Sequence, residues 1–105
     1  MQRVHFYVGE NKSIGLRIHA RDQAPFTIRD ATWELKGNYE TEAQGECEIN
    51  GDVIRAMIAP QKRVTYRLYF TYKVAEEILM ECIEVVAELW QTVFISNQYR
   101  SRRTR

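Results

Sequence analysis

The chain has 105 residues, of which 45% are hydrophobic and 28% charged, and its net charge at pH 7 is +1. A chain of this length forms one domain with its own core, and the composition argues against wholesale disorder. The near-neutral charge argues against a general nucleic-acid binder. No apolar run approaches the length of a membrane span, and the start, MQRVHFYVGENKS, lacks the long apolar segment of a signal peptide.

The N-terminal part reads as two short strands. Residues 3–8, RVHFYV, form a β-rich run that ends at a turn over residues 9–12. Residues 13–20 alternate between apolar and polar side chains, which predicts a half-buried antiparallel strand. The large apolar residues on its inward side are Ile14, Leu16 and Ile18.

A bridging segment and a third strand follow Pro25, which cannot donate a ladder hydrogen bond. We expect Phe26 and Ile28 to close one end of the core. Residues 31–36 alternate again and predict a strand that stops at Gly37. Its inward residues are Ala31, Trp33 and Leu35.

A hairpin is the clearest local signal in the middle of the chain. Cys47 and Ile49 alternate with glutamates, and we expect Ile49 to face the core. Asn50-Gly51 is the favoured pair for a two-residue type I′ turn, because both positions need φ > 0. Asp52 follows, so a loop longer by one residue is the alternative. Residues 53–58 return as the partner strand.

The stretch VTYRLYFTYKVAEEILMECIEVVAEL, residues 64–89, supports two interpretations of its second half. The first half is a strand, with Leu68 and Phe70 among its inward residues. In the second half, four glutamates spaced by four, three and four residues fit one stripe of a helix. The same half is apolar at most of residues 78–86, which suits a strand, and the strand before it needs a neighbour. Periodicity alone leaves strand and helix open over residues 76–95.

The residues that could carry chemistry form no recognisable motif. Cys47 and Cys82 are not in a CxxC pair, and Trp33 precedes both rather than lying between them as in an immunoglobulin disulfide, so we expect two free thiols. His5 and His19, the two histidines of the sequence, lack a convincing third ligand, so no metal is expected. The sequence predicts a protein that is not an enzyme and has no cofactor.

Three segments, SIGLRIHARDQAPFTIRDATWEL, GECEINGDVIRAMI and TYRLYFTYKVAEEI, resemble the small immunoglobulin-like domains of structural proteins in Gram-positive phages and prophages. Phage baseplate proteins carry such a domain at their N-terminus. The chain departs from that pattern before Tyr66, where a glycine is usual, and at residues 75–77, where an Asp-Gly turn is usual. The resemblance implies an all-β fold, an antiparallel immunoglobulin-like β-sandwich of about seven strands, with a short C-terminal helix as the alternative for the last element.

The end of the chain differs from the rest in charge. We expect residues 1–89 to form the sandwich and residues 90–105 to form a C-terminal arm, whose end, SNQYRSRRTR, has four arginines and no acid. Such an end is typical of a mobile tail or a contact arm, and exposed aromatics beside arginines make good interface anchors. The residues predicted for subunit contact are Trp90, Phe94, Tyr99, Arg100, Arg102, Arg103 and Arg105.

The resemblance implies a non-enzymatic structural or assembly component of a phage or prophage particle, of the tail or baseplate type. Its expected partners are copies of itself or other phage structural proteins. Binding to a membrane or to nucleic acid is not expected. Its expected location is the virion, or the bacterial cytoplasm during assembly, without a signal peptide. Two alternatives stay open: a carbohydrate- or host-surface-binding β-sandwich module, and a small regulator that docks a partner through its basic tail.

Overall fold

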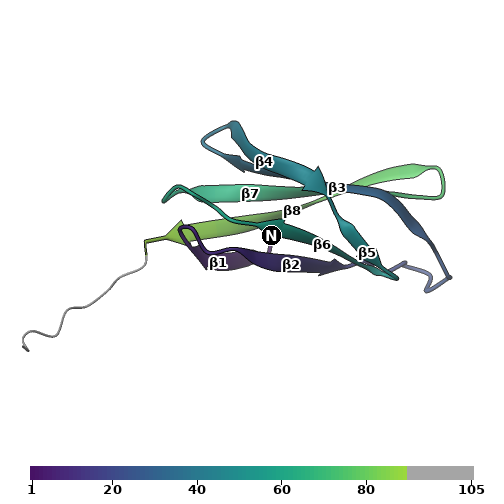
Figure 1. Ribbon diagram of the computed structural model, residues 1–105. Helices are drawn as coiled ribbons and strands as arrows, with labels where there is room; N and C mark the ends of the chain where they lie inside the picture. The colour runs from purple at the N-terminus through teal and green to yellow at the C-terminus, as the bar shows by residue number, and fades with distance from the viewer. Residues whose placement is uncertain (90–105) are drawn as a thin grey trace, which may run out of the picture.

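The computed structural model describes residues 1–89, which form eight β-strands and no helix (Figure 1). The strand count is one above the expected seven, because residues 40–46 form a strand that was not expected. The strands are β1 (Arg3–Tyr7), β2 (Lys12–Arg17), β3 (Ile28–Gly37), β4 (Glu40–Glu46), β5 (Glu48–Asn50), β6 (Val53–Ile58), β7 (Thr65–Val74) and β8 (Glu77–Glu88).

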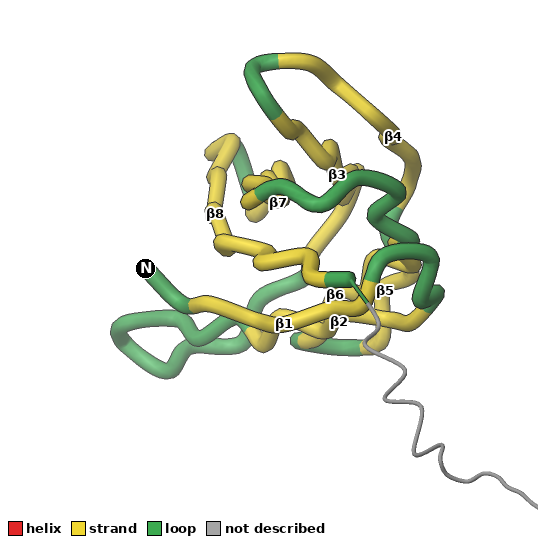
Figure 2. Tube along the Cα trace, turned by 90° about the vertical axis from the view of Figure 1, so that its left-hand side faces the viewer, coloured by secondary structure: helices red, strands yellow, loops and turns green. Residues whose placement is uncertain are grey.

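The strands form two sheets. The larger has the order β1-β8-β7-β3-β4, and the smaller has the order β2-β6-β5. Every pairing is antiparallel except that of β1 with β8, which is parallel. Figure 2 shows β3, β4 and β7 on one side of the molecule and β2, β5 and β6 on the other. The all-β prediction is confirmed, and the two sheets share one core in a sandwich-like arrangement.

The core is built from the side chains on the inward-facing side of the strands in both sheets. Leu35, Leu68 and Phe70 from the larger sheet and Ile54 and Ile58 from the smaller sheet are each at most 1% exposed. Their alternation with exposed residues, as in the β6 burial pattern, is what a strand with one buried face requires. Burial of side chains of this size contributes roughly 1.5–3 kcal/mol each, so these residues dominate the stability of the fold.

Most of the predicted core is confirmed, with one error and four residues at its margin. Ile14, Leu35, Leu68, Phe70 and Ile28 are buried. The residues that only pack against the core from its margin are Leu16, Ile18, Phe26 and Trp33.

Ile49 is the error, because it is 39% exposed. It lies on β5, all of whose residues are exposed at the edge of the smaller sheet. Trp33 is at the margin for a related reason: its ring packs over Gly45 on β4, the edge strand of the larger sheet. A Cβ at Gly45 would lie 3.2 Å from the indole.

Residues 65–88 form a hairpin, which decides between the two interpretations in favour of the strand. β7 and β8 pair from Thr65 opposite Val86 to Val74 opposite Glu77. The helical interpretation is therefore wrong for Glu77–Glu88, and its continuation to residue 95, like the possible C-terminal helix, lies outside the described residues.

The spacing of the β8 glutamates has a simple origin. Glu77 and Glu81 have the inward parity, but they are exposed near the hairpin tip. Glu84 and Glu88 point outward, since they alternate with inward residues such as Val85, which is buried. One pair of glutamates on each face produces the four-three-four spacing that resembles a helical stripe.

Three hairpin turns depend on left-handed backbone. The turn between β5 and β6 consists of Gly51 and Asp52, one residue later than predicted, and only Gly51 (φ +62°) is left-handed, so it is not type I′. Ala75 (φ +54°) turns the chain between β7 and β8, where the Arg29 guanidinium donates a hydrogen bond to its carbonyl. Asn38 and Tyr39, at φ 52° and 67°, form a type I′ turn between β3 and β4.

Tyr66, at the start of β7, ties three segments together. Its ring is fully buried beneath Gly37, where an added Cβ would lie 2.7 Å from two ring carbons. Its hydroxyl donates to Glu42 Oε1 at 2.6 Å and accepts from the Lys62 backbone N–H at 2.9 Å. The second oxygen of Glu42 accepts from the Gln61 N–H at 3.0 Å. The β6–β7 connection is thereby fastened to β4.

Candidate docking site

The most distinctive surface is one edge of β8. β1 pairs only with Glu84–Glu88, although β8 begins at Glu77. Within residues 1–89, Glu77–Ile83 therefore has β7 on one side and no strand on the other. We call this stretch the β8 edge. It lies at the hairpin end of the molecule, beyond the reach of β1 (Figure 1).

Backbone groups at the β8 edge are oriented outward. The Glu84 N–H donates to the Gln2 carbonyl at 2.9 Å, so the backbone groups of Glu84 face the side of β8 on which β1 lies. These groups alternate along a strand, which turns those of Ile78, Met80 and Cys82 toward the same side. An edge of this kind is a template for pairing with another chain.

Apolar side chains accompany these backbone groups. Ile78 is 68% exposed and Met80 is 63% exposed, while Leu79 between them is half-buried. Natural edge strands are normally short or charged where they face solvent. The β8 edge does carry exposed Glu77 and Glu81, so its charge is negative while its face is apolar.

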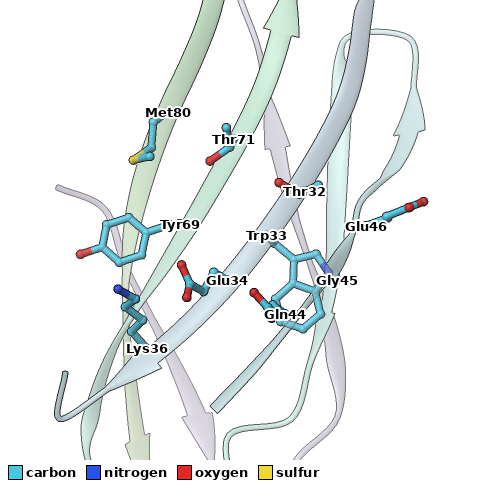
Figure 3. Close-up of a pocket in the computed structure, with 10 residues that line it drawn as sticks. All are labelled: Thr32, Trp33, Glu34, Lys36, Gln44, Gly45, Glu46, Tyr69, Thr71 and Met80. Atoms are coloured by element: carbon cyan, nitrogen blue, oxygen red, sulfur yellow. The ribbon is translucent and has the colours of Figure 1, made fainter. Parts of the chain in front are cut away.

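A hollow of about 600 Å³ lies on the outer face of the larger sheet (Figure 3). Tyr69 and Glu34 lie opposite each other on β7 and β3, and Thr71 lies opposite Met80 on β7 and β8. Glu34 accepts a hydrogen bond from the Thr41 hydroxyl, which fixes the carboxylate at this surface. Two half-buried aromatic residues, Tyr69 and Trp33, line the hollow together with hydrogen-bonding side chains.

Tyr39 lies in the β3–β4 turn, at the end of the larger sheet that is opposite to the β7–β8 turn. It is fully exposed, and it occupies the second position of a type I′ turn, where glycine is favoured. A bulky residue with φ > 0 is a conformational outlier. Strain of this kind, held at an exposed aromatic residue, is a reason to regard the tip as a contact point.

The candidate chemical residues are dispersed over the structure. Cys47 connects β4 to β5 and Cys82 lies on β8, with two strands between β4 and β8 in the sheet, and both thiols are free. Burial raises the pKa of Cys47 to about 11, and burial also raises the pKa of Cys82. Both therefore remain thiols at neutral pH, and the thiolate is the reactive form.

The histidines lie apart as well. His5 is on β1, with Nδ1 3.9 Å from Glu88 Oε2, and His19 follows β2. Residues 1–89 contain no group of three or more His, Cys, Asp or Glu side chains that could hold a metal ion. Among these residues there is also no helix of the length and apolar character that crossing a membrane needs.

The predicted interface residues Trp90, Phe94, Tyr99, Arg100, Arg102, Arg103 and Arg105 lie outside the described residues. Sequence reasoning did not single out Ile78 and Met80, which it treated only as part of the apolar run over residues 78–86. The sequence carried no signal for their exposure, because the pairing of β1 with only Glu84–Glu88 of β8 is visible in the structure alone. Comparison of the chain with protein-family models, curated proteins and solved structures gives no match.

Proposed function

We propose that this chain is a non-enzymatic structural or assembly component of a phage or prophage particle, of the tail or baseplate type, acting through protein–protein contacts. The observation that carries the proposal is the β8 edge, where Ile78 and Met80 are exposed beside outward-facing backbone groups. Exposed apolar side chains on a strand edge are a liability for a protein that acts alone. They are an asset for one that adds to an assembly.

The proposal includes an immunoglobulin-like fold, which the strand order supports. In that fold one sheet carries the second, fifth and fourth strands, and the other carries the third, sixth and seventh, with an added strand beside the third. Counting β4 as the added strand makes the order β8-β7-β3-β4 against β2-β6-β5 agree with this scheme. β1 departs from it, because it pairs with β8 rather than with β2.

Tyr66 supports the same assignment. Immunoglobulin-like domains have a tyrosine near the start of the sixth strand whose hydroxyl bonds to the backbone a few residues upstream. Tyr66 lies at the second position of β7, and its hydroxyl accepts from the N–H of Lys62, four residues upstream. Trp33 on β3 also matches the tryptophan of the third strand in that fold, although no disulfide lies beside it.

The test of the particle role is direct. Particles released from the bacterium that carries the gene, after prophage induction, are purified by density gradient and analysed by peptide mass spectrometry. The proposal expects peptides of this chain in the particle fraction at a stoichiometry comparable with other tail proteins. A chain found only in the particle-free lysate would refute the particle role.

The outer-face hollow favours a second candidate, a carbohydrate- or host-surface-binding module. A tyrosine face bordered by polar groups such as Glu34, Lys36 and Gln44 suits a sugar ring, because the ring has an apolar face and a hydroxyl rim. This module would bind glycan through Tyr69 without help from residues 90–105. Glycan-array binding that Tyr69→Ala abolishes would favour it over the assembly role.

A further inference from the structure

We propose that residues 90–95 of a second copy of this chain, WQTVFI, add as a strand to the β8 edge. The inference deepens the proposed assembly role and rests on it, because it names the site and the partner segment. The site is Glu77–Ile83, which lacks a neighbouring strand on one side within residues 1–89. The segment follows β8 directly in the sequence.

The composition of residues 90–95 suits the site. Trp, Thr, Val, Phe and Ile are the residue types enriched in strands, and they make up five of these six residues. An added strand satisfies backbone groups of the edge, and its side chains cover Ile78 and Met80. Main-chain hydrogen bonds then contribute affinity, and the apolar contacts set the register.

The reach of the chain favours a second copy over the same copy. To lie beside its own β8 edge, the segment must turn back at Leu89 and pass Glu84–Glu88, whose outer side β1 already occupies. The return from residue 89 to residue 83 spans about 20 Å at 3.3 Å per residue, which uses all six residues of the segment. All six residues of the segment would be needed to connect Leu89 to the β8 edge, so none of them would be left to pair with that edge in the same copy.

Charge complementarity points to the same partner. The β8 edge and its turn carry exposed Glu76, Glu77 and Glu81. Four arginines follow the segment, at residues 100–105. In the second copy the first of these arginines follows the end of the segment by five residues, or roughly 17 Å of extended chain, and the last by ten residues, or roughly 33 Å. Pairing that places residue 95 beside Glu77 directs them toward the acidic groups. Contacts between exposed charges of this kind weaken with salt.

The first experiment measures self-association of the full chain by sedimentation velocity. Met80→Lys places a charge in the proposed interface, and Phe94→Asp does the same on the added strand. Met57→Lys is the matched control, because Met57 is similarly exposed (59% against 63%) but lies on β6 in the other sheet. We expect both interface variants to weaken association at least about tenfold, which is about 1.4 kcal/mol, and Met57→Lys to change it by less than about twofold.

The second experiment locates the contact. Photoreactive benzoylphenylalanine replaces Met80 in one copy, which is mixed with an isotope-labelled full chain. We expect cross-links to labelled peptides that contain residues 90–95, and none when the same probe replaces Met57. Unchanged circular dichroism and melting temperature of each variant show that the fold is retained, so a loss of association is not a loss of folding.

The outcomes separate this inference from the proposed function. A wild-type chain that stays monomeric at about 1 mM, or an assembly that Met80→Lys leaves intact with no cross-link to residues 90–95, overturns strand addition. In either case the chain can still be present in purified particles. Conversely, strand addition observed in solution by a chain that purified particles lack refutes the particle role alone.

Discussion

The hydroxyl of Tyr66 donates a 2.6 Å hydrogen bond to Glu42, across from β7 to β4, strands that do not pair with each other. The same hydroxyl accepts from the Lys62 N–H. Burial, together with the Glu42 hydrogen bond and charge, raises the pKa of Tyr66 to about 12. The tyrosine is therefore held neutral as a donor to a carboxylate, which is the stronger class of hydrogen bond.

Tyr66→Phe is expected to destabilise the protein by about 2 kcal/mol, because it removes a donor to a charged group and leaves the Lys62 N–H without its hydroxyl acceptor. Chemical denaturation measures the change. Tyr39→Phe is the control, since that side chain is fully exposed, and its effect should stay within about 0.5 kcal/mol. Equal effects of the two substitutions would show that the Tyr66 hydroxyl does not fasten the connection.

Stability should fall at high pH through Tyr66. Its pKa is about 12 in the folded protein against an ordinary value of 10. Below pH 10 both states keep the proton, so the contribution is complete. Between pH 10 and 12 the unfolded state loses the proton first, so up to about 3 kcal/mol of stability is lost as the pH rises. Denaturation curves from pH 8 to 11.5 should show a steeper alkaline loss for the wild type than for Tyr66→Phe.

Two glycines offer a matched test of packing. In Gly37→Ala the new Cβ would lie 2.7 Å from ring carbons of the fully buried Tyr66, which cannot move aside, so we expect a cost of about 1–3 kcal/mol. In Gly15→Ala the close atom is Arg55 Nη1 at 2.9 Å, the end of an exposed side chain that can rotate away. That substitution should change the free energy of unfolding by less than about 0.5 kcal/mol. A similar cost at both positions would contradict the packing around Tyr66.

Tyr39→Gly should stabilise the isolated protein by about 1 kcal/mol, because glycine accepts φ > 0 without the clash that tyrosine makes. If the hairpin tip is a contact point, the same variant should weaken a partner interaction while raising the melting temperature. Opposite effects on stability and binding would identify Tyr39 as a functional residue. Loss of stability would show that the tyrosine ring supports the turn.

A chain ending at Leu89 should keep its fold, because the buried hydrophobic residues of the described chain lie between Phe6 and Ala87. We expect the same β-rich circular dichroism and a loss of self-association. Association of the full-length chain should weaken between about 50 and 500 mM salt, because the arginines of the arm act through screened charge pairs. Unfolding of the shortened chain would mean that residues 90–105 are part of the core.

How much of this could be predicted from the sequence depends on the element. Strict alternation in residues 65–74 placed Leu68 and Phe70 in the core, because the period of a strand is a local property. Ile49 was misplaced, since alternation says which face a side chain takes but not whether another sheet covers that face. The open side of β8 over Glu77–Ile83 depends on the five-residue length of β1, and that is visible only once the strands are paired.

The pairing of β1 with β8 also bears on how the chain folds during synthesis. Arg3 and Glu84 form an ion pair across 81 residues of sequence. β1 therefore has no neighbour in the larger sheet until β8 has been made. Such separated contacts slow folding, and unpaired strands are prone to aggregate meanwhile. Until β8 leaves the ribosome, β1 is open to capture by a neighbouring nascent chain or a chaperone.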